Sequence, residues 1–216
     1  KRFSVEGGET LIPLLAELLL HGSNLDVEEY VIGMAHRGRL NVLANILNKP
    51  YELIFQEFED NAPQSVGSGG DVKYHKGYSS EIEMSNHKKI KLHLAANSSC
   101  LESVDPIVLG QARARQVMMN DSERKKVGAI LIHGDAALSG QGVVYESLEF
   151  CRLPGYGTGG TIHIVINNQI GYTTLPQEGR STVYCTDIAK TFNAPVFHVN
   201  AEDPESCIFA ARLAIE

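Results

Sequence analysis

The chain alternates between stretches with a helical repeat of apolar residues and short, uninterrupted apolar runs. Apolar side chains recur three and four positions apart in residues 10–21, 39–48, 51–58, 105–119, 143–151 and 204–215, which predicts helices there. Short apolar runs typical of buried strands occupy residues 30–34, 91–95, 127–133, 161–166 and 196–199. The last three runs do not alternate with polar residues, which favours a parallel sheet covered on both faces. The sequence therefore predicts an α/β fold, with a parallel sheet that carries helices on both faces.

Two polar segments interrupt this pattern. Residues 61–80 are rich in Gly, Ser and Asp, and residues 168–187 contain little apolar periodicity. We predict a long loop in each. Long loops in compact domains are often functional, although composition alone fits an exposed variable loop equally well.

Composition and charge narrow the class of protein. Of the 216 residues 43% are hydrophobic and 21% are charged, which is typical of a globular chain. The net charge of −7 argues against a nucleic-acid-binding protein. The 4 cysteines form no C-x-x-C pair, so we predict reduced thiols in a bacterial cytoplasm or a mitochondrial matrix. No apolar run reaches the roughly 18 residues of a membrane span, so we expect no membrane association.

One glycine-rich stretch imitates a nucleotide-binding motif. Residues 155–160 read Gly-Tyr-Gly-Thr-Gly-Gly and match G-x-G-x-x-G. In a dinucleotide-binding fold this motif follows a strand and opens a helix. Here a predicted helix precedes it and a predicted strand follows it, so we predict a simple turn.

Polar residues directly follow two consecutive predicted strands. Asp135 comes after the strand at 127–133, and Asn168 comes after the strand at 161–166. The carboxyl ends of parallel strands meet at one rim of the sheet, where ligands bind. A carboxylate, an amide oxygen and a backbone carbonyl form the oxygen set that Mg²⁺ prefers, often shared with substrate phosphates. Alternatively, Asp135 caps the next helix and Asn168 lies in a turn; these residues by themselves leave both interpretations open.

The spacing of Gly134-Asp135 and Asn167-Asn168 resembles the signature of thiamine-diphosphate enzymes. Longer stretches resemble one family, the first, decarboxylating component of 2-oxoglutarate dehydrogenase complexes. The matching stretches are residues 1–8, 33–41, 70–77, 133–146, 165–171 and 195–200, in the order of the family.

The resemblance implies a thiamine-diphosphate-binding fold and a function. The family decarboxylates 2-oxoglutarate and transfers the succinyl unit reductively to a lipoyl group on the second component of the complex, with thiamine diphosphate and Mg²⁺ as cofactors. Residues 1–216 would form the diphosphate- and magnesium-binding domain of a longer, homodimeric protein. The chain begins at Lys1 rather than Met and stops inside a predicted helix, so we expect an internal fragment that lacks the pyrimidine-binding domain and is inactive alone.

The resemblance also assigns a cofactor role to four residues. Asp135, Asn168 and the main-chain carbonyl of Ile170 would hold Mg²⁺, which bridges to the diphosphate. Arg37 would lie in the cofactor site, where its guanidinium suits a phosphate.

Four further residues would face the substrate. His36 and His75 would be catalytic and would face the thiazolium ring and the oxo acid. Phe3 and Ser79 would line the substrate pocket. The family commonly carries Asn-Pro-Ser-His-Leu-Glu where this chain has Asn-Ser-Ser-Cys-Leu-Glu at residues 97–102. A thiol is a poor acid–base group near neutral pH, so Cys100 leaves any role of that histidine in doubt.

Three alternatives stay open at this stage. A relative that prefers 2-oxoadipate would share nearly all these motifs. Another thiamine-diphosphate enzyme, such as a transketolase or the pyruvate-specific homologue, would keep only the Gly-Asp and Asn-Asn pairs. A non-catalytic assembly module would use the α/β core without the chemistry.

Overall fold

The structure is a computed structural model that describes residues 3–58 and 74–216. Five strands within these residues form one sheet. The strands are β1 (Glu29–Met34), β2 (Tyr78–Glu83), β3 (Lys89–Leu94), β4 (Val127–Gly134) and β5 (Thr161–Ile166). The helices are α1 (Leu11–Asn24), α2 (Arg39–Asn45), α3 (Tyr51–Phe58), α4 (Asp105–Met118), α5 (Asp135–Gly140), α6 (Gly142–Glu149), α7 (Pro176–Gly179), α8 (Ile188–Thr191) and α9 (Pro204–Ile215), with a 3₁₀ turn η1 (Phe150–Arg152). None of these helices is long and apolar enough to cross a membrane.

The strand order places five chain segments at one rim of the sheet. The order is β2-β3-β1-β4-β5; β3, β1, β4 and β5 are mutually parallel, and β2 runs antiparallel to β3 at the edge. The carboxyl ends of the four parallel strands and the start of β2 therefore share this rim. The chain leaves β1 toward β3 on one side and leaves β4 toward β5 on the other. β1 and β4 thus flank a topological switch point, outside which α/β proteins bind ligands.

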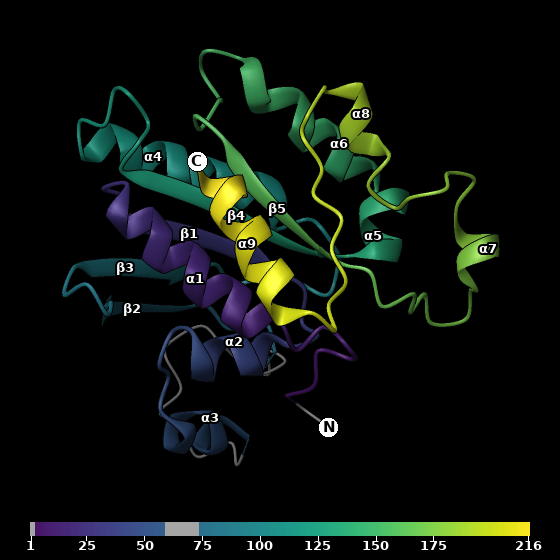
Figure 1. Ribbon diagram of the computed structural model, residues 1–216, viewed down its shortest axis with the longest axis horizontal. Coiled ribbons are helices and arrows are strands. Elements are labelled where there is room, and N and C mark those ends of the chain that lie inside the picture. The colour runs from purple at the N-terminus through teal and green to yellow at the C-terminus, as the bar shows by residue number, and fades with distance from the viewer. Residues whose placement is uncertain (1–2, 59–73) are drawn as a thin grey trace.

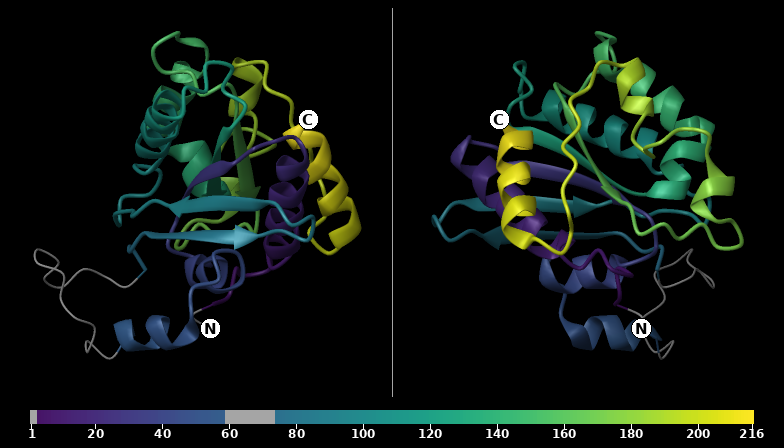
Figure 2. Two further views of the ribbon diagram at one scale, coloured as in Figure 1. Left: turned by 90° about the vertical axis from the view of Figure 1, so that its left-hand side faces the viewer. Right: turned by 45° about the vertical axis from the view of Figure 1, so that its right-hand side comes forward.

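Two apolar cores cover the two faces of the sheet, as predicted. Alternate residues of β1 and β4, such as Ile32 and Ile130, pack in one core with α1 and α2, and α9 lies beside α1 over this face (Figure 1). The intervening residues, such as Val31 and Leu131, pack in the second core with α4 on the opposite face (Figure 2). Because both faces are buried, the central strands contain apolar residues at successive positions.

Arg39, in the first turn of α2, links three segments of the rim by hydrogen bonds. Its side chain is fully buried, and no carboxylate among the described residues pairs with it. The guanidinium instead donates to three backbone carbonyls: Met34 at the end of β1 (3.2 Å), Lys76 just before β2 (3.0 and 3.2 Å), and Ala95 just after β3. Burial lowers the pKa of Arg39 to about 10, so the group stays charged at neutral pH. One cation therefore holds three strand ends in a fixed arrangement.

The pattern of apolar residues predicted most of these elements. The predicted helices correspond to α1, α2, α3, α4, α6 with η1, and α9, and four predicted strands correspond to β1, β3, β4 and β5. Residues 155–160 form a turn before β5, as predicted. Residues 168–187 are largely irregular apart from α7.

The predicted strand at residues 196–199 is wrong. This segment has no regular structure, and Val196 and Phe197 are about half exposed, at 47% and 46%. A cavity of about 790 Å³ is lined by both β5 and residues 194–202, so the segment faces β5 without the ladder hydrogen bonds of a strand. An apolar run is compatible with a strand, but a strand forms only where the chain can pair with a neighbouring strand about 4.8 Å away.

The predicted loop at residues 61–80 is wrong at its end. Residues 78–80 begin β2, whereas residues 61–73 lie outside the described part. Strand β2 alternates partly buried and exposed residues at the sheet edge, so it lacks the continuous apolar run that identifies the buried strands.

We expect Arg39→Met to destabilise the protein by about 2–4 kcal/mol, because it leaves buried carbonyls without their donor. Arg39→Lys should be intermediate, since an ammonium keeps the charge but cannot reach three carbonyls at once. Urea unfolding measures the difference. Arg113→Met is the control: Arg113 lies on α4, is half-buried and makes no hydrogen bond or ion pair with a described residue. Equal effects of the Arg39 and Arg113 substitutions would contradict this role.

Candidate active site

Residues that the sequence singles out follow one another along the rim. In spatial order, the rim carries His75 before β2, Asn97 after β3, His36 and Arg37 after β1, Asp135 after β4, and Asn168 after β5. The register pairs Gly134 with Ile166, so the loops after β4 and β5 start at the same level; Met34 pairs with Ile132, so the loop after β1 starts two residues earlier. The topology thus confirms the prediction that Asp135 and Asn168 follow neighbouring parallel strands.

Asp135 is the buried acid of the rim. It is the first residue of α5, and only 2% of its surface is exposed. Its Oδ2 accepts a hydrogen bond from Nη1 of Arg180 at 3.3 Å, whereas its Oδ1 is buried and accepts none from the described residues. Asp135 and Arg180 both line a cavity of about 180 Å³, together with Gln169 and Gly171. An unpartnered buried carboxylate oxygen at a cavity fits a cation ligand.

The other two predicted magnesium ligands lie on the same loop but do not line this cavity. The Oδ1 of Asn168 accepts a hydrogen bond from the backbone N–H of Ile170 at 3.2 Å, and Asn168 lines the larger cavity beside β5. Ile170 is 40% exposed. In this structure the residues that share the cavity with Asp135 are therefore Gln169 and Gly171, not Asn168 and Ile170.

The two predicted catalytic histidines form a second group. Part of the His36 side chain is exposed to solvent. The burial of the rest, together with the charges of Arg37 and His75, holds the pKa of His36 below its usual range. His75 is buried, and its Nε2 lies 3.4 Å from Oγ of Ser99. Arg37 is half-buried, and its guanidinium makes no hydrogen bond or ion pair within the described residues. Its neighbour Gly38 has a φ of +71°, a turn that lets Arg37 and Arg39 serve different surroundings.

The structure does not bring Phe3 and Ser79 to the histidines. The carbonyl of Phe3 accepts a hydrogen bond from the side chain of Asn41 at 3.1 Å, and its ring contacts Tyr51. The hydroxyl of Ser79 lies 2.9 Å from Nδ1 of His93, its cross-strand neighbour. Their place in a substrate pocket stays a prediction.

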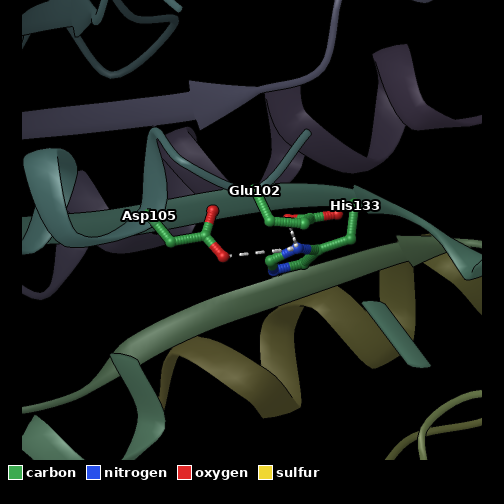
Figure 3. Close-up of side chains that lie close together, drawn as sticks. All are labelled: Glu102, Asp105 and His133. Atoms are coloured by element: carbon green, nitrogen blue, oxygen red, sulfur yellow. Dashed lines mark hydrogen bonds and ion pairs between the residues drawn. The ribbon is translucent and has the colours of Figure 1, made fainter. Parts of the chain in front are cut away.

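A buried polar network that the sequence reading missed lies beside Asp135. His133, at the end of β4, has Nδ1 2.6 Å from Oε2 of Glu102 and Nε2 2.9 Å from Nδ1 of His163 (Figure 3 shows Glu102, Asp105 and His133). Asp105 Oδ2 lies 4.0 Å from the same Nδ1 and accepts no hydrogen bond within the described residues. Burial lowers the pKa of His163 to about 3, so that ring is neutral.

The network has the geometry of hydrogen bonds rather than of a metal centre. Glu102, Asp105 and His133 are close enough to be considered as three ligands of one ion. Ligand atoms at right angles on a cation with bonds near 2.1 Å would lie roughly 3 Å apart. The 2.6 Å separation between Oε2 of Glu102 and Nδ1 of His133 is instead that of a short hydrogen bond.

A sequence signal for this network was present but was interpreted differently. Asp105-Pro106 reads as a helix start, yet the cap residue of α4 is Val104, and Asp105 is the first helical residue and faces His133. His133 is buried at the end of β4. Only the tertiary fold brings residues 102–105 to the end of β4.

The comparisons with known proteins agree with the resemblance. Residues 2–216 match the family described as "Dehydrogenase E1 component". Over its full length the chain is 54% identical to the "2-oxoglutarate dehydrogenase E1 component" of Haemophilus influenzae, of which it covers 23%. It is 51% identical to the "Multifunctional 2-oxoglutarate metabolism enzyme" of Mycolicibacterium vanbaalenii, of which it covers 18%. The chain thus spans less than a quarter of the length of these relatives.

The pH dependence of stability should report on Asp105. Burial, opposed by His133 and reinforced by Glu102, raises the pKa of Asp105 from 3.8 to about 7. Between these values the folded protein keeps a proton that the unfolded chain releases, so this group makes stability fall as the pH rises. Asp105→Asn removes that contribution. We expect urea unfolding at about pH 5 and about pH 7 to show a smaller loss of stability in the variant than in the wild type; an equal or larger loss would contradict the assignment.

Proposed function

Because the chain belongs to the dehydrogenase E1 component family, we propose that it is the diphosphate- and magnesium-binding part of an enzyme that decarboxylates 2-oxoglutarate. The complete protein would transfer the succinyl unit to a lipoyl group on a partner component and would act as a homodimer. The names of both relatives, which contain 2-oxoglutarate, support this substrate. Residues 1–216 alone would fold without catalysing the reaction, because the pyrimidine end of the cofactor would have no partner.

The observation that carries the proposal is the convergence at the switch point between β1 and β4. Within the described residues, the guanidinium of Arg37 after β1 makes no hydrogen bond or ion pair, and Oδ1 of Asp135 after β4 accepts none. A cation and a carboxylate that can hold Mg²⁺, on the loops of neighbouring strands, match a diphosphate bound as its magnesium complex.

The donor set fits magnesium. We propose that Asp135 supplies a carboxylate oxygen, Asn168 its amide oxygen and Ile170 its main-chain carbonyl, all of them hard oxygen donors. The Oδ1 of Asn168 accepts the N–H of Ile170 here, and its second lone pair and the carbonyl of Ile170 would be available to the ion. Thiamine diphosphate, when bound, supplies the electron sink for decarboxylation, and the protein supplies position and charge.

His36 and His75 suit the substrate end of the rim. A lowered pKa keeps His36 neutral near pH 7, so it can donate an N–H without adding a charge. His75 is held by burial and by Ser99, which restricts its ring. We propose that both donate hydrogen bonds to the oxo and carboxylate oxygen atoms of the substrate.

Asp135→Asn tests the metal assignment. In the complete protein it should weaken binding of thiamine diphosphate with Mg²⁺ by more than about 100-fold, because it removes the charged ligand of the ion. Isothermal titration calorimetry measures this affinity. Glu149→Gln removes one charge at the exposed end of α6 and should leave the affinity unchanged. Unaltered binding by the Asp135 variant would reject this placement of the metal.

His75→Ala separates substrate from cofactor. It should lower kcat/KM for 2-oxoglutarate by about 100-fold or more, with less than about a tenfold change in thiamine diphosphate affinity, because the lost donor acts on the reacting oxygen atoms. The control is His87→Ala, which alters an exposed histidine in the turn between β2 and β3. Steady-state rates with 2-oxoglutarate and 2-oxoadipate, read with an artificial electron acceptor, also decide between these two substrates. A comparable loss of cofactor affinity would assign His75 to the cofactor instead.

A further inference from the structure

Arg180 occupies the charged partner position of the proposed magnesium ligand. Its Nη1 lies 3.3 Å from Oδ2 of Asp135, and the two side chains are only 14% and 3% exposed. Arg180 comes from the loop after β5, directly after the short helix α7, 45 residues along the chain from Asp135. The contact therefore depends on tertiary structure and not on local sequence.

The pair solves an electrostatic problem. A buried carboxylate without a cation would be costly, and a nearby guanidinium removes most of that cost. The same solution creates a competition, because Mg²⁺ would neutralise the same carboxylate. Mg²⁺ at Oδ1, which is unpartnered among the described residues, would neutralise this carboxylate and repel the guanidinium on Oδ2, which weakens the hold of Asp135 on Arg180.

The surroundings limit where the displaced guanidinium can go. Arg180 lines the cavity of about 180 Å³ that Asp135 also lines. The other carboxylate that senses its charge is Asp187, whose pKa is held low chiefly by Lys190 and less by Arg180. Asp187 is already engaged, since it lies 2.6 Å from Nζ of Lys190 and accepts the N–H of Tyr184. An anion bound in the cavity would therefore offer Arg180 a partner that the described residues do not.

We propose that Arg180 is an exchangeable counterion. It neutralises Asp135 in the metal-free protein, yields that carboxylate to Mg²⁺, and then adds its positive charge to the binding of the diphosphate. This inference rests on the proposed function, which places the metal at Asp135. It predicts opposite effects on the two ligands: loss of Arg180 helps the metal and harms the diphosphate.

The experiment uses the complete protein and two simple probes. Binding of Mn²⁺ alone is followed by electron paramagnetic resonance, and binding of inorganic pyrophosphate at saturating Mg²⁺ is followed by calorimetry. Arg180→Gln should bind Mn²⁺ about tenfold more tightly and magnesium pyrophosphate about tenfold more weakly, each the equivalent of one lost ion pair of about 1.4 kcal/mol. Arg180→Lys should lie between the wild type and Arg180→Gln for both probes, because it keeps the charge without the fork.

Two further variants make the outcome decisive. Arg212→Gln breaks another guanidinium–carboxylate pair, with Glu17 at 2.6 Å between α9 and α1, and should change neither affinity. Asp135→Asn should lose Mn²⁺ binding. If Asp135→Asn binds Mn²⁺ like the wild type, the proposed metal site fails and the inference fails with it. If Asp135→Asn loses Mn²⁺ but Arg180→Gln binds it no more tightly than the wild type, only the inference is overturned.

General damage to the fold gives a different signature. A misfolded variant would bind both probes more weakly, whereas the exchange predicts changes of opposite sign. Thermal unfolding of each metal-free variant identifies loss of structure. If Arg180→Gln does not fold, Arg180→Lys decides: tighter Mn²⁺ binding supports the exchange, and unchanged or weaker binding overturns it.

Discussion

The candidate site depends on a buried cation, Arg39, that pairs with no acidic residue among those described. Its guanidinium gathers the carbonyls that end the parallel strands β1 and β3 and the carbonyl of Lys76 just before the antiparallel strand β2. It could not do so from solvent, because exposed guanidinium groups exchange these bonds with water. Its burial therefore fixes the spacing between the loop after β1, which carries His36, and the segment before β2, which carries His75. The buried charge of Arg39 therefore has a structural role, separate from the residues proposed to meet the substrate.

The loop at residues 97–103 connects three segments of the rim. Residues 97–103 reach His75 through Ser99, the end of β1 through the side chain of Asn97, and the end of β4 through Glu102 and His133. Glu102 has a φ of +67°, a costly backbone conformation that the short bond to His133 offsets. Hydrogen bonds thereby join the segment that carries His75 to His133 at the end of β4, two residues before Asp135.

The pattern of apolar residues predicted the helices and strands that depend on neighbouring residues in the chain. Burial on both faces leaves continuous apolar runs, so β1, β4 and β5 were identifiable, and helical periodicity marked α3 and α9 at their observed bounds. Edge strand β2 and residues 196–199 were misjudged because strand pairing depends on a partner that no local window contains. For the same reason the rim positions of Asp135 and Asn168 could be predicted from strand order, whereas the contact between Asp135 and Arg180 could not. Interactions between distant segments require the fold itself.

The contacts of the loop at residues 97–103 explain how it can carry Cys100 at a position where the resembled family commonly has histidine. The loop around it is held by backbone and hydroxyl groups: Ser98 Oγ accepts the N–H of Cys100, and Ser103 Oγ donates to its carbonyl at 2.7 Å. The thiol itself is exposed, and no described residue bonds to it. Replacing an imidazole by a thiol at this position therefore leaves the contacts of Ser99 and Glu102 in place. In the proposed function, proton transfer at this end of the rim would fall to His36 and His75, which lie close enough for the charge of His75 to lower the pKa of His36. The residues that hold the loop in place are thus different from those proposed to take part in the reaction, so the residue at position 100 can change while the loop keeps its contacts.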